Sequence, residues 1–349
     1  MVAIETIKSS NAALKGKLPA GLVALFVGAT SGIGEQTLRT FYQNAPSPRV
    51  YFIGRSQSSA DRIISSLKPL NPDGHLEFIQ ADLTLLKNVD EATKQFTEKE
   101  KELNLLVMSQ GFLTMGGRDG NTPTYTYPNY SSPTPPPVYL NRINEYTTTE
   151  TTEGIDTKLA LNWFSRARLI QSLLPTLSAT ASKSPFGARV VSVLAAGHEG
   201  PINFDDFELK KTFSLRNAAA HAGSANSAMV NYLAKQYPSV GFVHSYPGVV
   251  DTPMLEASKF PGIVKLTARV LMPVFRGFMI SPEDSGARHC WMATDEKFKT
   301  GGWNMDNDNE ESAAAKKSYE KGYCDEAVGE KVWKLTSEVF EKVEKEGKV

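Results

Sequence analysis

Three glycines follow an apolar run near the start of the chain, with the spacing of a dinucleotide phosphate site. The run 22–27 ends at Gly28, and Gly32 and Gly34 follow before a helical pattern begins. Glycine at such positions allows a tight turn, a close approach of the backbone to a pyrophosphate, and close packing of the helix on the strand. The first N–H groups of a helix lack intrahelical partners and attract phosphate. The segment therefore predicts a strand, a phosphate-binding turn and a helix.

Further apolar runs end in small or polar residues, and helical patterns separate them. Such alternation is typical of repeated strand–helix–strand units in a Rossmann-type, doubly wound parallel sheet of the α/β class. Right-handed crossovers place the carboxyl ends of all the strands on one edge, where ligands bind. We expect the run endings to line that edge: Gly54-Arg55-Ser56, Ala81-Asp82-Leu83, Ser109-Gln110-Gly111, Ala195-Ala196-Gly197 and Tyr246-Pro247-Gly248.

The pattern predicts one large domain over residues 21–300, after an extension over 1–20. A proline- and tyrosine-rich insertion at 116–152 cannot sustain a helix or a central strand. It is either a tolerated surface loop or a lid over the ligand edge, and the sequence leaves both open. An apolar flap is expected at 255–282, and amphipathic surface helices within 301–349.

Composition excludes several classes of function. The chain has 349 residues, with 38 Lys and Arg against 38 Asp and Glu, and this zero net charge argues against a nucleic-acid partner. Two cysteines favour a reducing compartment, and without a secretory signal a cytoplasmic location is expected. Three basic residues and a proline within 262–280 argue against stable membrane insertion. No metal site is expected.

The motifs together resemble the short-chain dehydrogenase/reductase family over roughly residues 20–300. The glycine loop matches that family at every fixed position, and Asn162 falls where the family keeps an asparagine in the helix after the fourth strand. The segment 195–199 and the C-terminal extension are most similar to fungal members from secondary metabolism. The resemblance implies cofactor contacts from Gly28, Thr30, Ser31, Gly32, Ile33, Gly34, Arg55, Asp82, Leu83, Gly111, Pro247, Gly248, Val250 and Thr252.

Arg55 follows the second predicted strand and favours NADP over NAD. An acidic residue there would accept hydrogen bonds from a ribose hydroxyl and repel a phosphate, whereas arginine can hold a 2′-phosphate through two hydrogen bonds. The resemblance also implies a homodimer or homotetramer built through the helices that flank the site.

The redox residues of the family are a serine, a tyrosine and a lysine, and this chain departs from all three. The serine position is Ala195, the tyrosine position is His221 and the lysine position is Ala225. No displaced tyrosine–lysine pair with the required spacing is found, since Tyr232 precedes Lys235 by three residues rather than four. The nucleotide half of the site is present in the sequence, and the chemical half is altered.

Two histidines are candidate proton donors, because imidazole titrates near neutral pH. His221 could act with Asn162 and a bound water, and His198 lies just past the fifth strand. The first hypothesis is an NADP-dependent oxidoreductase with an atypical proton donor, acting on a carbonyl or hydroxyl of a small hydrophobic substrate. The alternatives are a non-redox isomerase, dehydratase or cyclase on the same fold, and a catalytically silent nucleotide-binding protein.

Overall fold

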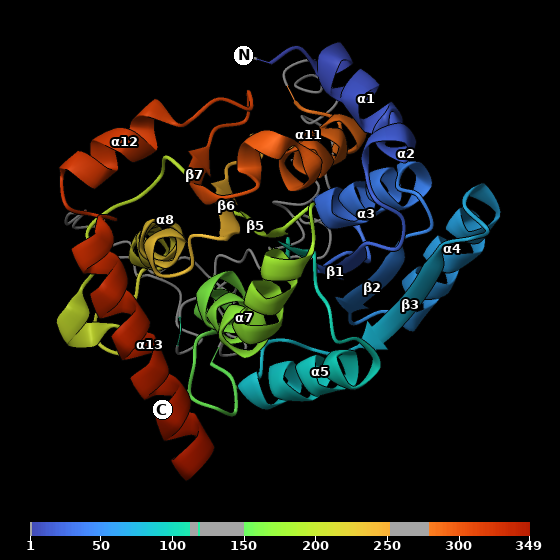
Figure 1. The fold of residues 1–349 in the computed structure, drawn as a ribbon. Coiled ribbons are helices and arrows are strands. Elements are labelled where there is room, and N and C mark those ends of the chain that lie inside the picture. The colour runs from blue at the N-terminus through green and yellow to red at the C-terminus, as the bar shows by residue number, and fades with distance from the viewer. Residues whose placement is uncertain (1, 112–117, 119–149, 252–278) are drawn as a thin grey trace, which may run out of the picture.

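A single seven-stranded parallel sheet forms the centre of the molecule (Figure 1). The computed structural model describes residues 2–111, 118, 150–251 and 279–349. Within these, the strand order is β3-β2-β1-β4-β5-β6-β7, and every neighbouring pair is parallel. The strands are β1 (Val23–Val27), β2 (Arg49–Gly54), β3 (His75–Gln80), β4 (Leu105–Met108), β5 (Ala188–Val193), β6 (Val240–Ser245) and β7 (Gly301–Met305).

Helices cover both faces of the sheet, as Figure 1 shows. One layer is built around the pair α3 and α11, with α1 packed against both of them and α4 against α3; the other contains α5, α7, α8 and α13. The bounds are α1 (Ile4–Ala12), α2 (Leu14–Lys17), α3 (Gly32–Asn44), α4 (Gln57–Leu67), α5 (Leu86–Lys99), α6 (Thr157–Leu159), α7 (Ser165–Lys183), α8 (Leu215–Gln236), α11 (Pro282–Thr294), α12 (Ala313–Glu320) and α13 (Glu326–Glu346).

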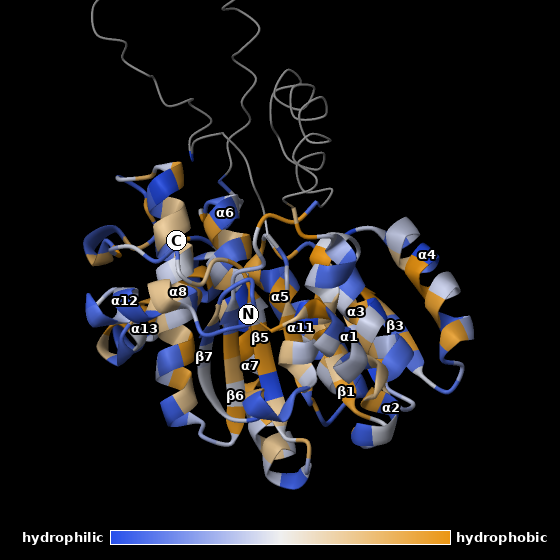
Figure 2. Ribbon diagram, turned by 90° about the horizontal axis from the view of Figure 1, so that it is seen from above, coloured by the Kyte–Doolittle hydropathy of each residue, from blue (hydrophilic) through white to orange (hydrophobic). Residues whose placement is uncertain are grey.

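The two layers follow from strands that are apolar on both sides. In β1, Val23, Leu25 and Val27 belong to one hydrophobic core, and Ala24 and Phe26 belong to the other. Successive side chains of a strand point to opposite faces, so a continuous apolar run can be satisfied only between two helix layers. Figure 2 shows these apolar residues concentrated on the strands, with mixed polar and apolar residues on the helices around them.

The structure confirms the predicted α/β class and the doubly wound sheet. All six strands expected from apolar runs are present, and α12 and α13 stand where surface helices were expected. The seventh strand was not predicted, because Gly301-Gly302-Trp303-Asn304-Met305 is no apolar run and pairs only at the sheet edge. Helices α1 and α2 occupy the N-terminal extension.

Two predicted segments lie largely outside the described residues. Most of the insertion at 116–152 and of the flap at 255–282 falls there, so both stay predictions. None of the helices in the described ranges is both long and apolar enough to cross a bilayer.

Candidate functional site

The glycine loop forms a tight turn from β1 into α3. Gly28 and Gly32 have φ values of 75° and 59°, a left-handed conformation that disfavours side chains. A Cβ atom on Gly28 would lie 2.5 Å from the backbone nitrogen of Gln110, and one on Gly34 would lie 2.6 Å from the carbonyl oxygen of Gly28. The turn after β4 therefore packs directly on the loop, and only glycine fits at these positions.

The N-terminus of α3 is left open toward solvent. Ser31, in the N-cap position, is exposed and makes no capping hydrogen bond with its side chain. The first-turn N–H groups, with the positive end of the helix dipole, can therefore bind an anion. Thr30 lies against the end of β2, where a Cβ on Gly54 would meet its Cγ2 at 2.4 Å, and Ile33 is half-buried in the first turn. This geometry fits a dinucleotide pyrophosphate.

Arg55 and Asp82, predicted from the ends of β2 and β3, line one pocket of about 360 Å³. Arg55 is exposed, and its carbonyl oxygen accepts a hydrogen bond from Gln80 Nε2 at 2.9 Å. Asp82 is exposed too and accepts a hydrogen bond from the Thr84 backbone, while Leu83 is buried beside it. The structure thus brings together the residues expected at the adenosine end of a nucleotide.

The segment after β6 is described up to Asp251. Gly248 has φ 76°, and a Cβ there would lie 2.7 Å from Ile280. Val250 pairs with Ile280 in a parallel bridge. Pro247 is half-buried at the same edge, Gly111 is described after β4, and Thr252 lies outside the described residues.

The side chain of His221 holds a loop. It is 4% exposed, and its Nε2 accepts a hydrogen bond from the backbone N–H of Asn203 at 2.8 Å. Burial lowers its pKa, against an opposing effect of the Phe207 carbonyl. Since Nε2 of the neutral His221 ring accepts this backbone hydrogen bond, that atom is not available to a substrate. A catalytic role of His221 stays a prediction. In the structure its side chain holds the backbone at Asn203 in place.

A fully buried arginine, which the sequence reasoning missed, lies behind the altered catalytic positions. Arg166 donates to Ser192 Oγ at 2.7 Å and to the carbonyl oxygens of Leu161, Met108 and Gln110. Burial lowers its pKa to about 9, so it stays charged at neutral pH. Among the described residues no carboxylate pairs with it. The sequence did contain a signal for it: an arginine among apolar residues of a helix, four positions after Asn162.

The network continues from Ser192 into α8. Ser192 Oγ donates to Asn226 Oδ1 at 2.7 Å, and Asn226 Nδ2 donates to the carbonyl oxygen of Asn162 at 2.9 Å. Asn162 sits in a π-helical turn, Ala160–Phe164, before α7. Its own side-chain oxygen is buried and has no partner among the described residues. The asparagine therefore presents an unsatisfied acceptor near the strand ends.

A second buried chain links β6, α8 and the turn after β5. His244 Nε2 accepts from the Ala195 N–H at 3.0 Å, which leaves its hydrogen on Nδ1, 2.8 Å from Ser227 Oγ. Ser227 in turn donates to Glu199 Oε1 at 2.6 Å, and Glu199 also accepts from the Gly197 N–H. Burial and the charges of Arg166 and His198 lower the pKa of His244 to about 3.

Known proteins match this chain as the motifs predict. The family model for short chain dehydrogenases matches residues 22–127. Oxidoreductase AN1596 of Emericella nidulans is 39% identical over 83% of this chain and 76% of that relative. The chain belongs to the short-chain dehydrogenase/reductase family. A second fungal relative, the short-chain dehydrogenase/reductase SAT2 of Stachybotrys chartarum, is 26% identical over 91% of this chain and 84% of its own length.

Solved structures agree on the fold of this short-chain dehydrogenase. The Pseudomonas aeruginosa RhlG/NADP active-site complex aligns with a TM-score of 0.55 at 19% identity, over 81% of this chain and 93% of that one. A short chain dehydrogenase from Shigella flexneri complexed with NADP aligns with a TM-score of 0.55 at 16% identity, over 83% and 98%. At such identities the likeness shows the fold alone.

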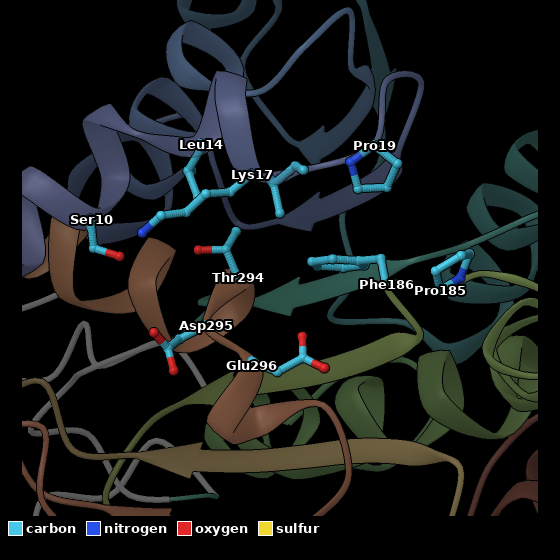
Figure 3. Close-up of a pocket in the computed structure, with 10 residues that line it drawn as sticks. Ser10, Leu14, Lys17, Pro19, Pro185, Phe186, Thr294, Asp295 and Glu296 are labelled. Atoms are coloured by element: carbon cyan, nitrogen blue, oxygen red, sulfur yellow. The ribbon is translucent and has the colours of Figure 1, made fainter.

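Another cavity of about 320 Å³ lies at the opposite edge of the sheet in this family member. Figure 3 shows residues of α1 and α2, the segment before β5 and the end of α11 around it. Phe186 and Lys17 are among its lining residues, and none of the predicted site residues is. This cavity therefore does not coincide with the candidate site at the carboxyl edge.

Proposed function

We propose that this short-chain dehydrogenase is an NADP-dependent oxidoreductase acting on a carbonyl or hydroxyl group of a small hydrophobic metabolite, in fungal secondary metabolism. The observation that carries the proposal is the glycine turn. Its positive φ values, its contact with Gln110 and the uncapped start of α3 fit a pyrophosphate. When bound, the nicotinamide supplies the hydride chemistry.

Preference for NADP rests on Arg55. Arg55 lines the pocket after β2 and β3 together with Asp82, and among the described residues its side chain is in no ion pair. An arginine at this position can hold a 2′-phosphate through charge-assisted hydrogen bonds, whereas NAD presents a hydroxyl there.

The test compares the two nucleotides by calorimetric titration. Charged hydrogen bonds contribute about 1.5–3 kcal/mol, so Arg55→Leu should weaken NADPH about 10- to 100-fold and leave NADH nearly unchanged. Lys68→Leu removes an exposed charge at the far end of α4 and is the matched control. Equal affinity of the native chain for both nucleotides would contradict the NADP preference.

An assay of turnover with and without nucleotide distinguishes a redox reaction from a non-redox one. The chain should oxidise NADPH in the presence of small hydrophobic ketones or aldehydes, with the alcohol as product. The altered positions Ala195 and Ala225 favour a second candidate, a non-redox isomerase, dehydratase or cyclase. Product formed without any nucleotide would support that candidate and exclude the redox proposal.

A further inference from the structure

Two ionisable aromatic side chains meet at the carboxyl edge between β5 and β6. These strands are parallel neighbours with Val193 opposite Ser245, so the residues that follow them emerge side by side. The rings of His198 and Tyr246 lie 4.4 Å apart, centroid to centroid, at an interplanar angle of 55°. Tyr246 directly precedes Pro247, one of the cofactor contacts that the family resemblance implies.

Backbone hydrogen bonds hold the two turns that carry these rings. The N–H of His198 donates to the carbonyl oxygen of Ala195 at 3.1 Å, and Ala195 is itself bound to the side chain of His244. The N–H of Tyr246 donates to the carbonyl oxygen of Met305 in β7 at 2.9 Å. Because both turns are tied to the sheet, the backbone from which the two side chains extend is fixed before a ligand arrives, and such positioning lowers the entropy cost of a proton transfer.

The polar atoms of the pair are available, in contrast to Nε2 of His221. His198 is exposed and Tyr246 is half-buried. Among the described residues neither the imidazole nor the phenol takes part in a side-chain hydrogen bond, whereas His221 Nε2 is occupied by Asn203. The half-buried phenol is in ring contact with an exposed imidazole, so a proton lost from the phenol can be replaced from solvent by way of the imidazole.

We propose that Tyr246 is the proton donor of the reaction and that His198 returns the proton to it from solvent. This inference rests on the proposed function. In the reducing direction, the carbonyl carbon gains a hydride from the reduced nicotinamide nucleotide as its oxygen takes the Tyr246 proton. The C=O double bond becomes a C–O single bond, the nucleotide is oxidised, and the phenolate is reprotonated through His198 from water.

Turnover of the variants tests the two roles. A general acid contributes about 10²–10⁴ in rate, so Tyr246→Phe should lower kcat at least ~100-fold while the affinity for NADPH changes less than ~3-fold. His198→Ala should lower kcat less, and added imidazole should restore it. Tyr237→Phe and His75→Ala, at the opposite edge of the sheet, are the matched controls and should retain activity. Full turnover by Tyr246→Phe would overturn the inference and leave the proposed function standing.

A second measurement needs no turnover. Diethyl pyrocarbonate should modify the exposed His198 and His75, and peptide mass spectrometry distinguishes them. Saturating NADP⁺ should slow modification of His198 at least ~5-fold and leave His75 unchanged. Equal rates at His198 with and without nucleotide would place it away from the nicotinamide and overturn the inference. If the native chain turns over no carbonyl, the proposed function fails, and this protection experiment alone decides the placement of the pair.

Discussion

The two ends of the candidate site are built from different parts of the chain. The phosphate end is made of backbone: glycines with positive φ, helix N–H groups and a turn packed within van der Waals reach. The chemical end is made of side chains, in which Arg166, His244 and their partners form buried hydrogen-bonded chains. The phosphate end keeps the family pattern and the chemical end departs from it, with Ala195, His221 and Ala225 at the three altered positions.

The largest effect on stability and on nucleotide binding is expected from one added methyl group at the phosphate end. Gly28→Ala places a Cβ 2.5 Å from the Gln110 backbone at φ 75°. Strain and overlap should lower the free energy of unfolding by at least about 3 kcal/mol and abolish NADPH binding. Urea unfolding and calorimetry measure the two effects.

Gly16→Ala is the matched control for that substitution. Gly16 lies in α2, where an added Cβ would meet nothing within 4 Å. Because alanine is the better helix former, this variant should gain up to about 1 kcal/mol. Retained nucleotide binding in Gly28→Ala would show that the turn is not the phosphate site.

At the chemical end, Arg166→Met should separate stability from nucleotide binding. Four buried acceptors lose their donor at once, so we expect a loss of about 3 kcal/mol in the free energy of unfolding. NADPH affinity should change less than ~3-fold, since the turn at Gly28 stays in place.

Arg189→Met provides the comparison, since Arg189 is also fully buried. It donates one hydrogen bond, to the Ala293 carbonyl, and its guanidinium lies over the Phe186 ring. Its removal should cost only about 1 kcal/mol. Equal losses in the two variants would show that the Arg166 network adds nothing beyond burial.

Buried histidines should make stability depend on pH. The pKa values of His244 and His289 are lowered to about 3 and 4, mainly by burial, below the value near 6.5 expected in the unfolded chain. Between these values the unfolded state binds more protons, so stability is complete above pH 6.5 and falls as pH decreases.

Each histidine contributes a slope of at most about 1.4 kcal/mol per pH unit. His244→Gln should remove one such slope in urea unfolding measured from pH 4 to 7, and His75→Gln, on an exposed residue, should leave it unchanged. An unaltered slope in His244→Gln would mean that this ring is protonated in the folded protein.

The smallest effect is expected at His221. His221→Gln keeps an acceptor near the Asn203 N–H and should cost about 1 kcal/mol in stability, with turnover reduced less than ~3-fold. Thermal unfolding and steady-state rates measure both. A 100-fold loss of kcat in a stable variant would return the proton donor to His221 and remove it from Tyr246.

Much of the fold could be predicted from local patterns. Apolar runs of strand length predicted six strands, of which β1, β4, β5 and β6 are buried along their whole length between two helix layers. The seventh strand escaped prediction because Gly301-Gly302-Trp303 has no apolar alternation and is held by pairing with β6. The other edge strand, β3, was predicted because Leu76, Phe78 and Ile79 give it the apolar residues that β7 lacks.

The candidate site also has a part that could be predicted from the sequence and a part that could not. The glycine turn from β1 into α3 could be predicted from the sequence alone, because the requirement for positive φ and close approach falls on single glycines at fixed spacing. The sequence also placed Arg55, Asp82 and His198 at strand ends, since chain direction in a parallel sheet sets that edge.

The contacts between side chains from different elements became visible only in the folded protein. The fold joined Arg166 to Ser192, His244 to Ala195, and His198 to Tyr246, pairs that are 26, 49 and 48 residues apart. Hydrogen bonds and ring contacts depend on separations of a few ångströms between side chains from different elements. No local pattern encodes those separations, because they are set by how the helices pack on the sheet.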